Sequence, residues 1–232
     1  MMFENRADAG RRLATQLGDY TNRNDVIVLG IPRGGVPVAF EIAMALNAPL
    51  DVFVSRKLGV PWQEELAFGA VASGGVRVLD SEVVGGAGIS DSEIERVTAT
   101  ARMEVERRER AYRNDRPPLK LEGRTVILVD DGIATGSSMR AAISALRELK
   151  PARLVIAVPV VPESTCNRLE REVDQLVCLL MPESFSGIGE FYDDFSQLAD
   201  AEVTELLRRA ERLSTRRDGI AEPFMPKNKG DL

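Results

Sequence analysis

Short apolar runs alternate along the chain with segments whose apolar residues recur at helical spacing. The runs are too short for helices and end at turn residues, which is typical of buried strands: 26–31, 51–55, 126–129, 154–161 and 175–180. The helical patterns fall between and after them, at 7–17, 36–46, 139–146, 162–173 and 201–213. This alternation predicts an α/β fold in which helices flank a central, mostly parallel, twisted sheet, with ligands at the carboxyl ends of its strands.

The middle of the chain breaks this alternation. Residues 65–80 form two short apolar-polar runs around a Ser-Gly-Gly turn, which predicts a hairpin. Residues 83–89 are rich in glycine and are interpreted as a connection. Ser90 and Glu93 form a capping box, so a long helix is expected from there towards Arg113. Its interleaved charges of both signs favour a solvated helix face over a nucleic-acid site.

The composition is that of one large soluble domain. The 232 residues suffice for a domain at 1–213, followed by a polar stretch with glycine and proline at 214–232 that we interpret as a flexible tail. No apolar run approaches membrane-spanning length and the start lacks the core of a signal peptide, so we expect a cytoplasmic protein without a membrane partner. The net charge of −6 argues against bulk nucleic-acid binding.

The absence of histidine restricts the chemistry further. With no histidine in the chain, catalysis by Ser-His-Asp or Cys-His and HExxH zinc chemistry are excluded. Cys166 and Cys178 stand apart without a CxxC pattern, so they indicate neither a zinc site nor a disulfide scaffold. Any general acid or base must be a carboxylate, lysine, tyrosine or the substrate itself.

The strongest motif follows the apolar run 126–129. Asp130 and Asp131 come directly after it, and a small loop rich in hydroxyls, GIATGSS, leads into the next helical pattern. Unpaired N–H groups at a helix N-terminus bind phosphate, whereas two carboxylates repel it. The aspartates must therefore serve another part of the same ligand, and vicinal sugar hydroxyls are natural donors to them. A strand-to-helix turn capped by serine is the simpler alternative, and the full combination argues against it.

The sequence VILVDDGIATGSS resembles the phosphoribosyl pyrophosphate (PRPP) signature of the type I phosphoribosyltransferases. The resemblance implies that Asp130 and Asp131 hold the ribose hydroxyls and act in catalysis. It also implies that the following loop binds the 5′-phosphate through Ala134, Thr135, Gly136, Ser137 and Ser138. The implied reaction is the magnesium-dependent transfer of the 5-phosphoribosyl group from PRPP to a nitrogen acceptor, a nucleobase, with release of pyrophosphate. The family fold adds a flap hairpin, expected within 58–118, and a small C-terminal hood, expected at 181–200.

Two basic segments extend the resemblance. The first strand ends in Pro32-Arg33-Gly34-Gly35, which is similar to the family's pyrophosphate loop and its cis peptide, expected here between Pro32 and Arg33. Arg56 and Lys57 begin an RKxGxP pattern that resembles the adenine-type enzymes, where basic residues meet pyrophosphate. We expect this pair at the end of the parallel strand 51–55, although a solvated Arg-Lys pair would look the same.

An aromatic cluster near the C-terminus suggests the acceptor site. Phe185, Phe191 and Tyr192 lie in a segment that looks like the base-stacking part of the hypoxanthine-guanine enzymes, and by position Asp193 would be the acid near magnesium. Those enzymes place a lysine directly after the preceding strand, and this chain has no lysine at that position. Specificity for purines therefore does not follow. The cluster could equally cap the core.

Two other functions remain open on the same fold. The protein could be a PRPP-sensing regulator, which a continuous basic face would favour, or a hydrolase of ribosyl phosphates, which would release product without an acceptor. The sequence does not identify the acceptor base. The sequence does not determine the oligomeric state, although such domains often dimerise and a homodimer is one candidate.

Overall fold

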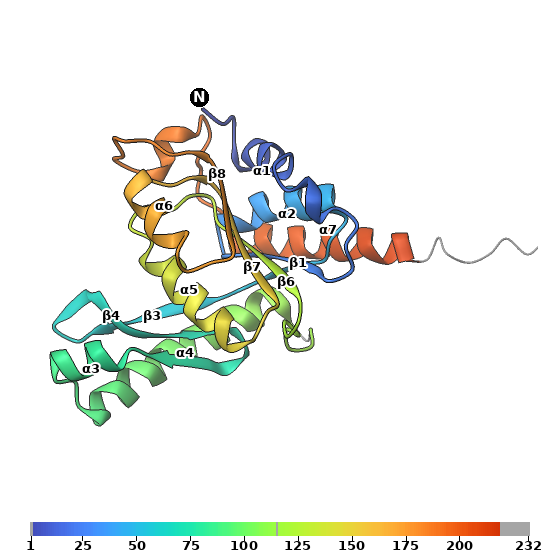
Figure 1. The fold of residues 1–232 in the computed structure, drawn as a ribbon. Helices are drawn as coiled ribbons and strands as arrows, with labels where there is room; N and C mark the ends of the chain where they lie inside the picture. Colours follow the sequence, from blue (N-terminus) through green and yellow to red (C-terminus); the bar gives the residue numbers. More distant parts are fainter. Residues whose placement is uncertain (1, 115, 219–232) are drawn as a thin grey trace, which may run out of the picture.

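The fold is α/β, as predicted. Its central sheet, which was expected to be mostly parallel, is entirely parallel. The structure is a computed structural model that describes residues 2–114 and 116–218 (Figure 1). Five strands lie in the order β2-β1-β6-β7-β8. They are β1 (Val26–Gly30), β2 (Leu50–Val52), β6 (Thr125–Val129), β7 (Arg153–Val160) and β8 (Gln175–Leu180). None of the helices in the described part is both long and apolar enough to cross a bilayer.

Helices cover both faces of this sheet, which is why its inner strands are apolar throughout. Successive side chains of a strand point to opposite faces. On β1 and β6, Val28 and Ile127 pack into one hydrophobic cluster with α2 and α7, whereas Leu29 and Leu128 pack into another with α5 and α6. The first face carries α1 (Arg6–Ala14), α2 (Gly35–Leu46) and α7 (Asp200–Asp218); the second carries α5 (Ser137–Glu148) and α6 (Glu163–Leu169).

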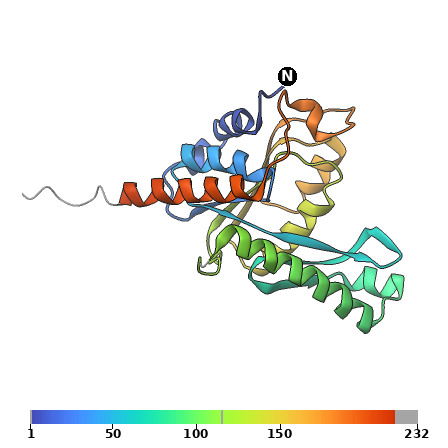
Figure 2. The same ribbon diagram turned by 180° about the vertical axis from the view of Figure 1, so that it is seen from behind.

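The middle of the chain forms an arm that projects from this body. It consists of the antiparallel strands β3 (Ser55–Val60), β4 (Gln63–Ala72) and β5 (Val76–Leu79), with α3 (Ser81–Ala87) and α4 (Asp91–Arg113) beside them (Figure 2). The hairpin around Ser73 and the capping box at Ser90 are confirmed. The expected connection at 83–89 is wrong, because Asp80 caps the short helix α3 by accepting from the N–H groups of Glu82 and Val83.

Two other boundaries differ from the prediction. The expected strand 51–55 is split: β2 ends at Val52, and β3 begins at Ser55 as part of the arm. The final helix continues past residue 213 to Asp218, so the first part of the predicted tail is helical. The remainder of that tail, 219–232, lies outside the described residues. A small hood at 181–200 contains the 3₁₀ helix η3 (Ile188–Phe191) and pairs with the N-terminal segment through a bridge between Phe3 and Tyr192.

Candidate functional site

The loops after β1 and β6 meet at the carboxyl edge of the sheet. The two strands are neighbours, and Gly30 pairs with Val129 at their ends. A side chain at Gly34 would overlap the carboxylate of Asp131, and one at Gly35 would overlap the backbone of Val129 and Asp130. The loop 32–35 can therefore approach the acidic pair only with glycine at both positions. The expected cis peptide between Pro32 and Arg33 is present.

The two aspartates differ in their surroundings. Asp130 is half-buried, and its Oδ1 accepts the N–H of Asp131 at 2.9 Å. Withdrawal from water, followed by the neighbouring charge of Asp131, holds the pKa of Asp130 well above its usual range, and the charge of Arg6 opposes this shift. Asp131 is buried, and its Oδ2 accepts from Nε of Arg6 at 2.7 Å. The pair thus carries two carboxyl groups beside one close cation.

Arg6 is a site residue that the sequence did not reveal. It lies just before the helical pattern 7–17 and belongs to no motif, but its side chain is only 11% exposed. Arg6 is the first residue of α1, directly after the cap residue Asn5, so its side chain leaves the helix at the end nearest the hood. Its place at the start of the helix therefore determines what its side chain contacts, and the spacing of apolar residues does not. Its partner, Asp131, lies far away in the sequence.

The phosphate-binding prediction falls on a loop with suitable geometry. Gly136 takes the left-handed backbone conformation, with φ of 81°, and α5 begins at the next residue, Ser137. The hydroxyls of Thr135 and Ser137 lie 3.2 Å apart, and Thr165 of α6 donates to the carbonyl of Ala134 at 3.0 Å. The first N–H groups of a helix lack partners within it, so this end of α5 suits an anion.

The basic residues approach this loop from two directions. Arg33 is half-exposed, and its Nη1 lies 3.8 Å from Oδ1 of Asp200. Arg56 and Lys57 were predicted to follow a parallel strand, and this is wrong. They belong to the antiparallel strand β3 of the arm. They nevertheless line a cavity of about 510 Å³ that also includes Ser138 of the loop predicted to bind phosphate. The arm therefore brings these two cations to the same cleft by a different route.

Helix α4 contributes to that cleft as well. Arg96 and Thr100 line the same cavity. Sequence reasoning assigned this helix to a solvated face because its charges alternate in sign. The alternation is real, but one side of the helix turns to β3, where Leu58 and Val60 pack in the same buried cluster as Ala101. The apolar residues Leu58 and Val60, two positions apart in β3, were the signal that could have placed a helix against this strand.

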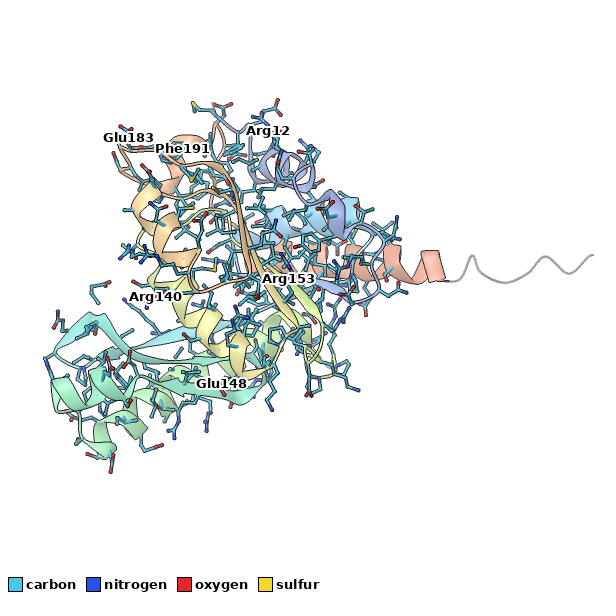
Figure 3. The ribbon with its side chains drawn as sticks, viewed as in Figure 1. Arg12, Arg140, Glu148, Arg153, Glu183 and Phe191 are labelled. Atoms are coloured by element: carbon cyan, nitrogen blue, oxygen red, sulfur yellow. The ribbon has the colours of Figure 1, made fainter. Side chains whose placement is uncertain are left out.

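The aromatic residues of the hood differ in how deeply they are buried. The rings of Phe185 and Phe191 are half-buried and stacked, with centroids 5.8 Å apart (Phe191 is labelled in Figure 3). Tyr192 is buried against Phe3, and its hydroxyl donates to the carbonyl of Asp131 at 2.6 Å. Burial raises the pKa of Tyr192. The predicted base-stacking role of Tyr192 is therefore wrong, because neighbouring residues cover its ring.

Asp193, the predicted metal-side acid, is exposed, and its backbone N–H donates to the carbonyl of Phe3 at 2.8 Å. Within the described residues, no three histidine, cysteine or acidic side chains gather in a way that could hold a metal ion. Asp193 and the acidic pair therefore do not form a metal cage of protein ligands. An ion at this site would need ligands from a bound molecule.

Comparison with known proteins gives consistent relatives. The model of the phosphoribosyl transferase domain matches residues 2–194. Two proteins of Mycobacterium tuberculosis named putative phosphoribosyl transferase, MT0597 and Rv0571c, are each 45% identical over 211 residues, which is 91% of this chain and 47% of theirs. The chain thus spans about half the length of these curated relatives. The crystal structure of TT1426 from Thermus thermophilus is similar with a TM-score of 0.82 and 40% identity, covering 90% of this chain and 99% of that one.

Proposed function

The chain belongs to the phosphoribosyl transferase family, and we propose that it transfers the 5-phosphoribosyl group of PRPP to a nitrogen acceptor and releases pyrophosphate. One observation carries this proposal: the glycine loop after β1 fits against the acidic pair after β6, and the hydroxyl-rich N-terminus of α5 follows directly. A sugar site, a phosphate site and a cationic loop thereby adjoin one another.

Each part of PRPP has a chemically matched partner in this arrangement. The ribose hydroxyls would donate to the carboxyl oxygens of Asp130 and Asp131. The 5′-phosphate would accept from the N–H groups and hydroxyls at the start of α5. The pyrophosphate would lie against the loop of Arg33 and against Arg56 and Lys57, whose charges it matches.

The same groups support the chemistry of the transfer. Breaking the bond between C1 and the pyrophosphate oxygen places positive charge on the ribose ring, and the carboxylate of Asp131 stabilises that charge. The leaving pyrophosphate gains negative charge, which Arg33, Arg56 and Lys57 offset. Because the chain has no histidine, the acceptor would lose its proton to a carboxylate, lysine or tyrosine, or to the pyrophosphate of the substrate itself.

Magnesium fits this site as an ion that arrives with the substrate. Mg²⁺ keeps several waters and is usually bound by one or two carboxylates together with substrate phosphates. The described residues offer Asp193 and the acidic pair but no three-ligand cluster, which suits that mode of binding. When bound, the ion would neutralise pyrophosphate charge.

We propose an aromatic nitrogen base as the acceptor. The stacked rings of Phe185 and Phe191 supply a flat apolar surface in the hood, which favours a planar ligand. The residues after β7, Val161, Pro162 and Glu163, supply no lysine to read a purine carbonyl. The proposal therefore names the class of acceptor and leaves the ring to experiment.

The experiment is pyrophosphate release from PRPP with magnesium, measured against purine and pyrimidine bases and without a base. Release that depends on one base supports the transferase. Release without a base would instead indicate hydrolysis, and PRPP binding without release would indicate a sensor. The matched inactive variant is Asp130→Asn, with turnover expected to fall about 100-fold or more. Asp131→Asn is less suitable, because it also leaves the buried charge of Arg6 unpaired.

A further inference from the structure

Asp131 is held at one oxygen and open at the other. Its Oδ2 accepts from Nε of Arg6 at 2.7 Å, and no N–H group in the described ranges 2–114 and 116–218 donates to its Oδ1. The two side chains are 11% and 12% exposed. A carboxylate oxygen has two acceptor positions, so Oδ1 has room for a donor from a ligand.

Arg6 is itself firmly placed. Its Nη1 donates to the carbonyl of Ser196 at 2.9 Å, and its guanidinium lies 3.9 Å from the centroid of the Phe195 ring. A planar guanidinium that both stacks on a ring and forms directed hydrogen bonds has little freedom to move. Asp131 therefore has a fixed anchor.

The anchor belongs to a unit formed by the N-terminal segment and the hood. Phe3 donates to the carbonyl of Phe191 at 2.8 Å, and Asp194 donates to that of Glu4 at 3.0 Å. Tyr192 of the same hood donates to the backbone carbonyl of Asp131 at 2.6 Å. The N-terminal segment and the hood together hold Asp131 by its side chain and by its backbone.

We propose that Arg6 is a positioning residue for phosphoribosyl transfer: it fixes Oδ2 of Asp131 and so presents Oδ1 to a ribose hydroxyl of PRPP. This inference rests on the proposed function. Taking both charges out of water is costly and is offset only when the geometry is good, so a pair that leaves one acceptor unfilled suits a ligand site. Ordering the carboxylate before the ligand arrives also lowers the entropy cost of binding.

Pyrophosphate is the probe that separates positioning from support of the fold. It corresponds to the pyrophosphate group of PRPP and has no ribose, so it does not need Asp131. A variant that loses only the alignment of Asp131 should bind PRPP more weakly and pyrophosphate normally. A variant in which the hood has lost its structure should be affected in both, and should melt earlier.

The experiment titrates PRPP and pyrophosphate, each with magnesium, into Arg6→Ala, Arg6→Lys and the wild type by calorimetry. Arg6→Ala should weaken PRPP binding about 10- to 100-fold, as expected for a hydrogen bond to a charged group, and change pyrophosphate binding less than about twofold. Arg6→Lys should recover part of the PRPP affinity, because it keeps the charge. Arg11→Ala, on the same helix but 55% exposed, is the matched control and should bind both ligands normally.

A double-mutant cycle tests whether Arg6 acts through Asp131. In an Asp131→Asn background, Arg6→Ala should weaken PRPP binding by less than about twofold, because the carboxylate that it positions is already gone. The proposal would be overturned if the two substitutions weakened PRPP binding independently, so that their fold-changes multiplied. It would also be overturned if Arg6→Ala left PRPP affinity unchanged, or if it weakened the binding of PRPP and pyrophosphate equally. If Arg6→Ala does not fold, Arg6→Lys and Phe195→Leu carry the same comparison. Failure of the wild type to bind PRPP would instead reject the proposed function.

Discussion

Two buried arginine–aspartate pairs in this molecule look alike by distance and burial. Arg6 lies 2.7 Å from Asp131 at the candidate site, with side chains 11% and 12% exposed. Arg113 lies 3.0 Å from Asp51, where α4 returns to the sheet, with side chains 9% and 13% exposed. Neither measure tells which of the two serves a ligand.

The pairs differ in how completely their acceptors are filled. Oδ1 of Asp51 accepts from Nε of Arg113 and from the N–H of Val52, and its Oδ2 accepts from Nη2 of Arg113. Arg113 also donates to the carbonyl of Pro117. Oδ1 of Asp131, by contrast, accepts from no N–H group in the part of the chain that the structure describes. A closed pair indicates a structural role, and an open one a binding role, because an acceptor oxygen that the protein leaves unfilled can take a donor from a ligand.

The largest expected effect tests the closed pair. Arg113→Ala should lower the free energy of unfolding by about 3 kcal/mol, because it removes the close partner of the buried Asp51 carboxylate and leaves, within the described residues, only Arg116 at 3.9 Å. Urea denaturation measures this loss. Once folded, the variant should bind PRPP within about twofold of the wild type, since loss of a structural pair leaves the site intact.

Arg110→Ala is the matched control, because Arg110 is exposed on the same helix and its loss should change stability by less than about 0.5 kcal/mol. A specific loss of PRPP affinity in the folded Arg113→Ala protein would show that a closed pair can also serve the ligand. The distinction drawn from filled and unfilled acceptors would then fail.

A smaller effect is expected at Arg56 and Lys57, the two cations of the arm that line the cleft. Arg56 is exposed and makes no ion pair within the described residues, and Lys57 pairs only with Glu65, which is 87% exposed. Exposed pairs contribute little, so both cations are available to pyrophosphate. Arg56→Ala and Lys57→Ala should each weaken pyrophosphate binding about 10-fold, which corresponds to ~1.4 kcal/mol.

These two variants should differ from Arg6→Ala. They should weaken the binding of both pyrophosphate and PRPP, whereas Arg6→Ala should weaken the binding of PRPP alone. Calorimetry at low and high salt measures the loss and its expected decrease as screening rises. Glu65→Gln is the control, and it should leave pyrophosphate binding unchanged or slightly stronger. Normal pyrophosphate affinity in both alanine variants would remove the arm from the binding site.

The sequence could predict the parts of the site that depend on local rules. Apolar strands with glycine turns after them identified the loops at 32–35 and 130–138, and parallel pairing brings the ends of neighbouring strands to one edge. The contact between Gly34 and Asp131 follows from that rule. The same rule failed for Arg56 and Lys57, because the chain leaves the central sheet after Val52 and turns into the arm.

The sequence could not predict contacts that depend on which side chains face one another across the fold. Arg6 and Asp131 are far apart in the chain, and nothing in the residues around either one indicates the other. Phe191 and Tyr192 are adjacent aromatic residues, yet only Tyr192 enters the buried cluster with Phe3. A concentration of aromatic residues identified the hood, but which ring packs inward depends on packing across the whole hood.

The smallest expected effect concerns the stability of the acidic pair itself. The pKa of Asp130 is raised above its ordinary value of 3.8, so the folded protein holds this proton more tightly than the unfolded chain does. The resulting stability is present below the ordinary pKa and is lost as the pH rises through the folded-state pKa. Above that folded-state pKa, an ionised Asp130 beside Asp131 is therefore a cost to stability. Asp130→Asn should stabilise the protein there by about 1 kcal/mol, or ~2–4 °C in Tm.

Calorimetric melting of both proteins between about pH 4 and 8 checks this expectation, since the two curves should converge at the acid end. Asp194→Asn is the control, because the N–H of Ser196 lowers the pKa of Asp194. This substitution should therefore lower Tm at pH 7, where Asp130→Asn should raise it. A gain in Tm with loss of turnover would mean that Asp130 is retained for the ligand at a cost to the fold, as is common at active sites. A loss of stability at pH 7 in Asp130→Asn would mean that a partner compensates the charge of Asp130. The acidic pair would then be filled within the protein, like the closed pair of Arg113 and Asp51.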